Sequence, residues 1–278
     1  MAKMTGGKAV LESLKSHGVE VIFGLIMGHN LEIYDALYDS QESVKYIGGR
    51  TELACGHMAD GYARASGKPG IVPTSTGCGA VDSMGSLAEA YNAGSPVLEI
   101  ATNQPKELIN AGRMVCHDLK GQTDMFSFVT DWSALVTENE SIPDYISEAF
   151  RRFQVRRPRP IELEFPSDML GETTDVEITP PIPTDLPKGS PDMVEAAANK
   201  LLQAERPIII LGDEVNHWGG TSEIIQLVEK LGIPVITDAG GKGAFPEDHP
   251  LYLGRTYGLP LWGVNPVHEF LLTCDLAL

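Results

Sequence analysis

Short runs of β-branched and aromatic residues alternate along this chain with segments of helical periodicity, and glycines stand at many of the boundaries. Strands that alternate with helices in this way pair in parallel and carry helices on both faces of the sheet. The sequence therefore predicts an α/β fold with a doubly wound parallel sheet in residues 1–166. Its strands are expected at Val19–Ile26, Val44–Gly49, Gly70–Ser75, Pro96–Thr102, Trp132–Thr137 and Pro160–Phe165.

A change of composition separates this first domain from the rest of the chain. Residues 167–190 are rich in proline and acidic residues, which favours an extended linker. A second α/β pattern begins at Pro191, with strands expected at Pro207–Leu211 and Pro234–Asp238. The last residues, Thr273–Leu278, look like the beginning of a strand. We therefore expect residues 191–278 to form a Rossmann-like domain that is truncated.

Charge and composition narrow the functional classes. The chain has 21 basic and 38 acidic residues, so its formal charge is 21 − 38 = −17. Such a chain repels phosphate backbones and anionic lipids, which argues against nucleic acid and membrane partners. No apolar stretch approaches the ~20 residues of a membrane helix, and the N-terminus lacks the pattern of a signal peptide. These features predict a cytoplasmic protein.

The segment Tyr46–Arg64 carries the first candidate for chemistry. A predicted strand ends at Gly48 and Gly49, and Thr51 is expected to cap a helix that holds Glu52 in its first turn. This position lies at the carboxyl edge of a parallel strand, where open α/β sheets bind ligands. A glutamate in a first turn can also be a solvated residue that complements the helix dipole. The residue pattern alone leaves both alternatives open.

Two glycine turns are expected at the same edge. Thr76-Gly77-Cys78-Gly79 lies between the strand Gly70–Ser75 and a helix over Ala80–Ala93, and Met27-Gly28-His29-Asn30 follows the first strand. Glycine allows the backbone to approach a ligand at a helix N-terminus. Because Asp82 occupies the place of a third glycine, the first turn does not complete a dinucleotide-binding fingerprint.

The residue pattern around these positions resembles that of a known family. The pattern R-x-E-x-x-x-x-H-M-A-D-G-Y-A-R over Arg50–Arg64, followed by SGKPGI and TSTGCGA, is similar to the pyrimidine-binding domain of thiamine-diphosphate enzymes of the acetolactate synthase and pyruvate decarboxylase type. The second half, with its IPV strand, FPEDHP and LGRTYG, resembles the central domain of these enzymes. Their Gly-Asp-Gly motif with a distant Asn is not matched, because Gly212-Asp213-Glu214 has only its first two residues. We therefore expect the diphosphate-binding domain to be absent.

This resemblance implies roles for individual residues. Glu52 is expected to hydrogen-bond the aminopyrimidine of thiamine diphosphate and so to help the cofactor lose its C2 proton. Family members carry a Gln-Glu pair where this chain has His117-Asp118, and a histidine beside an acid can transfer protons. A surface-loop histidine is an equally open alternative. The expected catalytic residues are Glu52, His117 and Gln122. The expected cofactor-binding residues are Gly28, His29, Glu52, Thr76, Gly77, Cys78, Gly79 and Asn103, and no metal ligand is expected in this chain.

The implied activity is that of a carboligase or decarboxylase acting on 2-keto acids. Its cofactors would be thiamine diphosphate and Mg²⁺, with the Mg²⁺ ligands outside this chain, and FAD is compatible with the central domain. The expected partners are a diphosphate-binding domain, from a missing segment or another polypeptide, and further copies of the chain in a dimer or tetramer. Three alternatives stay open. They are a subunit or fragment that supplies only the pyrimidine half of a site, a 2-hydroxyacyl-CoA lyase, and a non-catalytic flavin- or nucleotide-binding protein.

Overall fold

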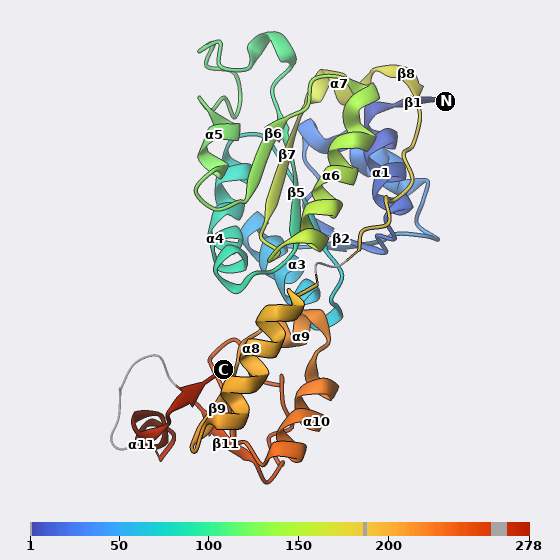
Figure 1. Ribbon diagram of the computed structural model, residues 1–278. Coiled ribbons are helices and arrows are strands. Elements are labelled where there is room, and N and C mark those ends of the chain that lie inside the picture. Colours follow the sequence, from blue (N-terminus) through green and yellow to red (C-terminus); the bar gives the residue numbers. More distant parts are fainter. Residues whose placement is uncertain (1, 186–187, 257–265) are drawn as a thin grey trace. The chain divides into compact units, whose positions relative to one another are not determined.

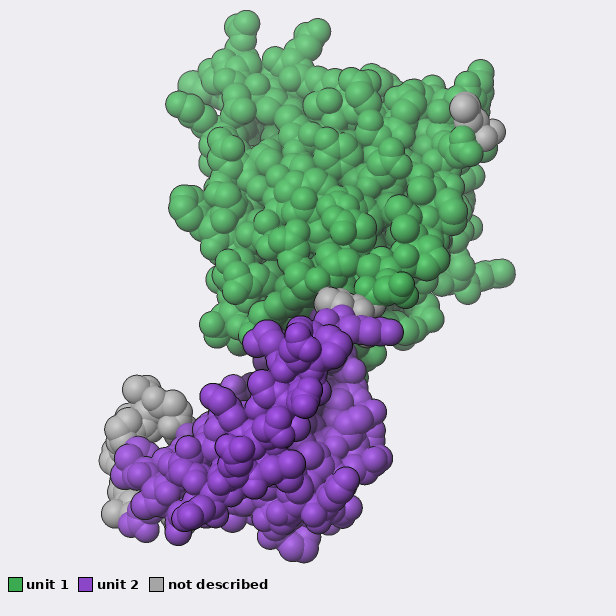
Figure 2. Space-filling view, in the orientation of Figure 1, with its two compact units in different colours: residues 1–186 green, residues 187–278 purple. Residues whose placement is uncertain are grey.

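A computed structural model describes residues 2–185, 188–256 and 266–278. The chain divides into two compact units, residues 1–186 and 187–278 (Figure 2). Both units are built from parallel strands and helices, which confirms the predicted α/β class. The first unit contains every predicted site residue.

The sheet of the first unit is assembled from strands that are not consecutive in the chain. Four parallel strands follow the order β4 (Gly70–Thr74), β5 (Val97–Asn103), β7 (Ile161–Pro166) and β6 (Trp132–Leu135). A parallel pair, β2 (Val21–Gly24) and β3 (Lys45–Gly48), lies beside β4. A Cβ atom placed on Gly24 of β2 would lie 3.3 Å from Pro73 Cδ of β4, and Pro73 has no N–H to donate. These two strands accordingly belong to separate hydrogen-bonded sheets. The six strands that the sequence predicts are all present.

Helices cover both faces of this sheet (Figure 1). One core contains apolar residues of α1 (Gly6–Ser16), α2 (Leu31–Tyr38) and α6 (Ile142–Val155), and the other contains those of α3 (Glu52–Ser66), α4 (Cys78–Ala93) and α5 (Gln122–Phe126). Strand residues alternate between the cores, as the two-residue period of a strand requires. Ile100 of β5 belongs to the first core, and its neighbour Ala101 belongs to the second. The short 3-10 turns are η1 (Gly28–Asn30), η2 (Lys106–Leu108) and η3 (Asn139–Ser141).

The beginning of the predicted linker is folded. Residues 167–176 form a short helix, α7 (Ser167–Gly171), and a strand, β8 (Thr173–Val176), which pairs antiparallel with β1 (Ala2–Thr5). Met169 and Leu170 are fully buried in the first core, and their burial holds this segment on the unit. The prediction that the linker begins at residue 167 is therefore wrong for its first ten residues.

The second unit has a parallel sheet of its own. The strand order is β11 (Tyr252–Arg255), β10 (Val235–Thr237), β9 (Pro207–Leu211) and β12 (Leu276–Ala277). Its helices are α8 (Pro191–Gln203), α9 (Glu214–Trp218), α10 (Thr221–Leu231) and α11 (Pro266–Thr273). The strand predicted to begin within Thr273–Leu278 is confirmed as β12. The last two residues of the LGRTYG motif, Tyr257 and Gly258, lie outside the described residues.

Within the described ranges, every helix is too short or too polar to serve as a membrane span.

Candidate cofactor and active site

Glu52 begins α3 directly after β3, at the carboxyl edge of the sheet. The Thr51 side chain accepts a hydrogen bond from the Ala54 N–H at 3.1 Å, which caps the helix as the sequence predicts. The Leu53 N–H donates to Asp82 Oδ2 of α4 at 3.2 Å, so the first turns of the two helices are tied together. The Glu52 side chain is half-buried. Part of it therefore remains accessible from outside the protein.

A glycine on α4 makes room for this carboxylate. A Cβ atom placed on Gly79 would lie 2.7 Å from Glu52 Oε1, closer than real Cβ contacts come, and 3.3 Å from Ser75 Cβ, which is tight. The Ser75 hydroxyl is also buried, and it has no hydrogen-bond partner among the described residues. Glu52, Ser75 and the bare backbone at Gly79 therefore form a narrow polar cradle at the N-terminus of α4.

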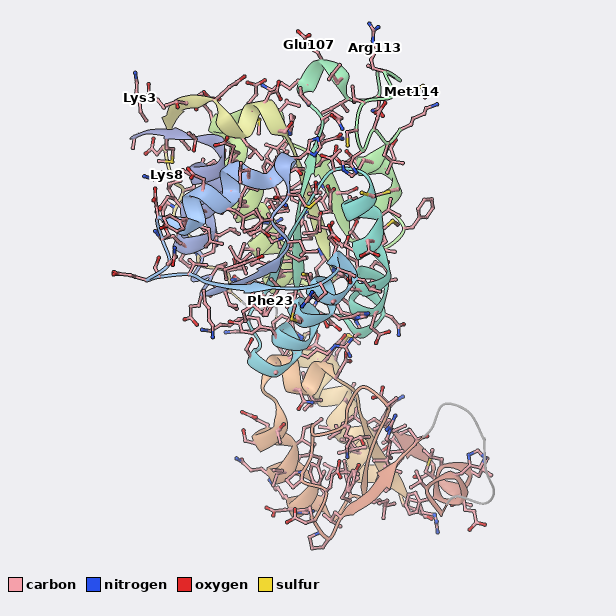
Figure 3. The ribbon with its side chains drawn as sticks, turned by 180° about the vertical axis from the view of Figure 1, so that it is seen from behind. Lys3, Lys8, Phe23, Glu107, Arg113 and Met114 are labelled. Carbon is pink, nitrogen blue, oxygen red and sulfur yellow. The ribbon has the colours of Figure 1, made fainter. Side chains whose placement is uncertain are left out.

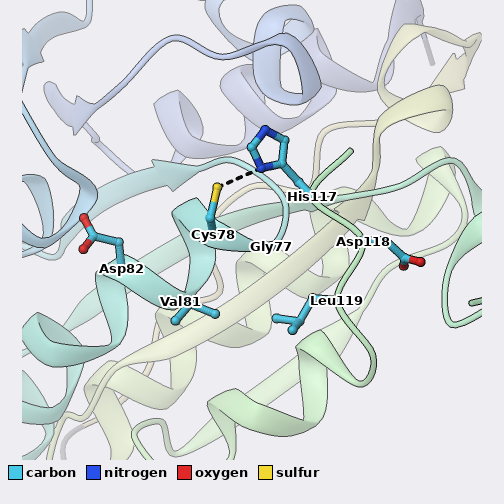
Figure 4. Close-up of a pocket in the computed structure, with 7 residues that line it drawn as sticks. All are labelled: Gly77, Cys78, Val81, Asp82, His117, Asp118 and Leu119. Carbon is cyan, nitrogen blue, oxygen red and sulfur yellow. Dashed lines mark hydrogen bonds between the residues drawn. The ribbon is translucent and has the colours of Figure 1, made fainter. Parts of the chain in front are cut away.

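The turn before α4 brings Cys78 to His117 (Figure 4). Gly77 has φ +63°, and a Cβ atom there would lie 2.1 Å from the His117 carbonyl oxygen. The two chain segments can therefore meet only if residue 77 is glycine. Cys78 Sγ lies 2.8 Å from His117 Nδ1. The His29 ring stands edge-on to His117 with 5.8 Å between centroids, and burial together with His117 lowers the pKa of His29.

A cavity of about 420 Å³ opens beside this pair. Apolar and acidic side chains share its wall. The lining residues are Gly77, Cys78, Val81, Asp82, His117, Asp118 and Leu119. The cavity is large enough for a small carboxylic acid, and His117 and Cys78 are its proton-carrying groups besides the two aspartates.

The loop that carries His117 has a strained backbone. Among the described residues, the non-glycine residues with positive φ are Asn110 at 61°, Met114 at 55° and His117 at 64°, and all three belong to this loop. Figure 3 shows Arg113 and Met114 at its outer end, with their side chains directed away from the unit. Conformations of this kind persist only where surrounding contacts enforce them, and they cluster at functional sites.

Gln122 and Asn103 lie beneath the site, where both are buried. Gln122 Oε1 accepts from the Gly77 N–H at 2.7 Å, and its Nε2 donates to the Thr102 carbonyl at 2.9 Å. The Asn103 Nδ2 donates to Glu164, and its Oδ1 accepts from the Gln104 N–H at 2.7 Å. Their side-chain polar groups are thus bonded within the protein, in positions that support the site from below.

Thr76 and Gly28, two further predicted cofactor-binding residues, differ in their surroundings. Thr76 is fully buried, and its hydroxyl has no partner among the described residues. Gly28 lies in η1, where an added Cβ would contact nothing within 4 Å, so packing does not require glycine there. Across the described ranges, no group of three or more His, Cys, Asp or Glu side chains has the arrangement of a metal site.

Sequence reasoning missed three glutamates in the sheet beneath the site. Glu99 on β5 and Glu162 and Glu164 on β7 are all fully buried, and Glu99 stands opposite Glu162 in the parallel register. Burial raises the pKa of Glu99 to about 8, although Thr74 and Ser83 donate hydrogen bonds to it. Burial also raises the pKa of both other carboxyls. The sequence did contain a signal for them, because acidic residues inside two otherwise apolar strands are unusual.

A carboxylate at the carboxyl edge of a parallel sheet, set against a glycine turn at a helix N-terminus, defines an α/β protein built to bind a cofactor. Comparisons with known proteins agree with this class. Residues 4–127 match the family model of the thiamine pyrophosphate enzyme N-terminal TPP binding domain, and residues 194–278 match that of the central domain. The chain belongs to the thiamine pyrophosphate enzyme family.

Several curated relatives align with almost the whole chain. It is 35% identical over 282 residues to a probable acetolactate synthase large subunit of Methanocaldococcus jannaschii, covering 99% of this chain and 46% of that protein. It is 32% identical over 277 residues to a probable 2-ketoarginine decarboxylase of Pseudomonas aeruginosa, covering 99% and 48% respectively. An acetolactate synthase of Arthrospira platensis is 33% identical over 289 residues, with shares of 99% and 48%. The chain thus spans about half the length of these relatives.

Proposed function

We propose that this chain supplies the pyrimidine-activating half of a thiamine-diphosphate-dependent enzyme that decarboxylates 2-keto acids or joins them to a second carbonyl compound. The observation that carries the proposal is the position of Glu52, whose carboxylate lies against the backbone of Gly79 at the start of α4. The relatives named acetolactate synthase and 2-ketoarginine decarboxylase support this substrate class.

The residues present fit the pyrimidine end of the cofactor. Glu52 would hold a proton shared with the ring nitrogen N1′, since a half-buried carboxylate forms a strong charge-assisted hydrogen bond. The cradle of Ser75 and Gly79 lacks a Cβ where a flat ring would approach, and it contains an unpartnered hydroxyl. The cofactor, when bound, supplies an electron sink for the carbon that loses carbon dioxide.

His117 and Cys78 are proposed to act on the substrate side of the site. Their polar atoms meet at 2.8 Å in the wall of the cavity, so a proton can pass between the thiol and the imidazole. An imidazole at this place can deliver a proton to the reacting carbon or withhold it, which is the choice between simple decarboxylation and ligation. Asp118 and Asp82 add negative charge to the wall.

The complete enzyme would need parts that lie outside this chain. The diphosphate of the cofactor would be held through Mg²⁺ by a domain outside this chain, either a further segment or another polypeptide, in a homo-oligomer. A flavin would be sought in the second unit, at the glycine turn after β10. A 2-hydroxyacyl-CoA lyase is the neighbouring alternative within the same family.

The test is the substitution Glu52→Gln in the complete enzyme. An amide cannot hold the shared proton at N1′, so we expect exchange of the cofactor C2 proton, followed by NMR, to slow by a factor on the order of 10² or more, while cofactor affinity changes little. Glu32→Gln is the matched control, because Glu32 is also a half-buried glutamate in the first turn of a helix. Wild-type exchange in the Glu52 variant would remove Glu52 from the mechanism.

A further inference from the structure

Glu164 is a buried carboxylate on β7 that the proposed chemistry does not use. It is fully inaccessible to solvent, yet both of its oxygens receive hydrogen bonds from side-chain amides. Asn103 Nδ2 donates to Oε1, and Gln122 Nε2 donates to Oε2 at 3.1 Å. The Thr123 hydroxyl is a further donor. A buried carboxylate with this many donors is anchored firmly, and it orients the groups that bind it.

The contact with Gln122 leads to the turn that carries Cys78. Because Glu164 and the Thr102 carbonyl both accept from Gln122 Nε2, the amide must direct its oxygen the other way. That oxygen accepts the N–H of Gly77 at 2.7 Å. The position of Gly77, and with it the start of α4, therefore depends on the orientation that Glu164 imposes on Gln122.

The contact with Asn103 leads to the loop that carries His117. Asn103 donates to Glu164, so its oxygen faces the N–H of Gln104 at 2.7 Å. Gln104 Nε2 then donates to the carbonyl of Cys116 at 2.6 Å, one residue before His117. This chain of bonds holds the strained part of the loop against the sheet.

We propose that Glu164 is the positioning residue of this site, which holds Cys78 and His117 together by fixing Gln122 on one side and Asn103 with Gln104 on the other. The two chains of hydrogen bonds start from one carboxylate and end on the two segments that meet at Gly77 and His117. Its importance for turnover rests on the proposed function. Its effect on the loop geometry does not.

An amide at position 164 cannot replace the carboxylate. Glutamine offers one acceptor and one donor, whereas Asn103 and Gln122 both present donors. Reversing the Gln122 amide would turn its NH₂ toward the Gly77 N–H, and reversing the Asn103 amide would turn its NH₂ toward the Gln104 N–H. Whichever way the three amides are turned, two N–H donors therefore face each other at one point of the network. Glu164→Gln must break at least one of the two hydrogen-bond chains.

The same strand offers a matched control. Glu162 is two residues away on the same face of β7 and is equally buried, but within the part of the chain that the structure describes no side chain donates a hydrogen bond to it. Glu162→Gln removes a buried carboxyl at the same depth and leaves both hydrogen-bond chains intact. A difference between the two variants reports on the network and not on the loss of a buried acid.

The experiment measures amide hydrogen exchange at Gly77 and alkylation of Cys78 by iodoacetamide between pH 5 and 9 in a Cys116→Ser, Cys274→Ser background. In Glu164→Gln we expect Gly77 to exchange at least about tenfold faster, and the alkylation profile to approach that of His117→Gln. Glu162→Gln should stay within about twofold of the parent chain in both measurements. Neither readout requires cofactor or turnover, so the proposed function can fail without affecting them.

A Glu164→Gln chain that behaves like Glu162→Gln in both measurements would overturn the proposal. If Glu164→Gln does not fold, Glu164→Asp serves instead, because it keeps the charge but is one methylene too short to reach both amides. Gly77 exchange at the parent rate in Glu164→Asp would overturn the proposal equally.

Discussion

At Gly79 a missing side chain decides where a carboxylate can lie. An added Cβ would come within 2.7 Å of Glu52 Oε1, a distance that real Cβ contacts do not show. Glu52 can respond by moving, since its carboxylate is the free end of a flexible side chain. That movement would shift the group that the proposed function requires at the cofactor ring. The absence of a side chain at position 79 on α4 therefore sets the position of the carboxylate that the proposed reaction needs.

Gly79→Ala should accordingly slow cofactor C2 proton exchange about ten- to a hundredfold, because small displacements of a catalytic group have effects of this size. Gly61→Ala is the control. Gly61 lies within α3 with nothing within 4 Å of its added Cβ, so this change should raise the free energy of unfolding by about 0.5–1 kcal/mol and leave exchange unchanged. Exchange rates from NMR and urea unfolding curves check both expectations, and equal effects of the two substitutions would contradict the steric argument.

At the scale of elements, the sequence predicted what local patterns determine. Thr51, Glu52 and the glycines around them place α3 within the predicted segment, and β12 appears where the last residues suggested a strand. β1 and β8 were missed because AKMT and TTDV are only four residues long, and the two strands that pair are about 170 residues apart along the chain. Their pairing is a tertiary contact, which local propensity does not encode.

The buried glutamates show a second limit of sequence reasoning. PIELEF alternates apolar and acidic residues, a pattern typical of a strand with one face in water. In the fold, α4 and α5 cover that face, so Glu162 and Glu164 are enclosed. The hydrogen-bond partners of Gln122 and Asn103 could not be predicted from the sequence either. Only the packed structure shows that their amides are bonded to Glu164 and to the backbone. The roles of these two residues in catalysis and cofactor binding stay predictions.

Glu99 makes a pH dependence testable. Burial raises its pKa to about 8, so the folded protein keeps a proton that the unfolded chain releases near its ordinary pKa of 4.5. The folded state then binds more protons between these values, and the free energy of unfolding falls as pH rises, by up to about 1.4 kcal/mol per pH unit for this group. Glu162 and Glu164 act in the same direction.

Glu99→Gln removes this proton while Thr74 and Ser83 can still donate to the amide oxygen. We therefore expect the variant to gain stability relative to the wild type as pH rises from 5 to 8, with little difference near pH 4.5. Urea unfolding at several pH values gives the comparison. Parallel pH curves for the two proteins would show that Glu99 is ionised in the folded state at neutral pH.

At the scale of the whole molecule, the chain carries a net charge of −17 and, within its described residues, no cluster suited to a metal ion. The cofactor diphosphate is itself strongly anionic and needs a divalent cation with oxygen ligands. We therefore expect the 278-residue polypeptide by itself to bind thiamine diphosphate weakly, without dependence on Mg²⁺, and to show no turnover. Calorimetric titration with and without Mg²⁺ tests this, and tight Mg²⁺-dependent binding would reveal a phosphate site in this chain.

The antiparallel pair of β1 and β8 sets Ala2 opposite Val176 and Thr5 opposite Thr173, so the first strand of the first unit lies beside its last strand. In mechanical terms, a pull on Ala2 and Val176 would open the pair like a zipper, one rung at a time, before any load reached the central sheet. In evolutionary terms, a unit whose first and last strands adjoin can be inserted into a loop of another protein or circularly permuted without stretching its core.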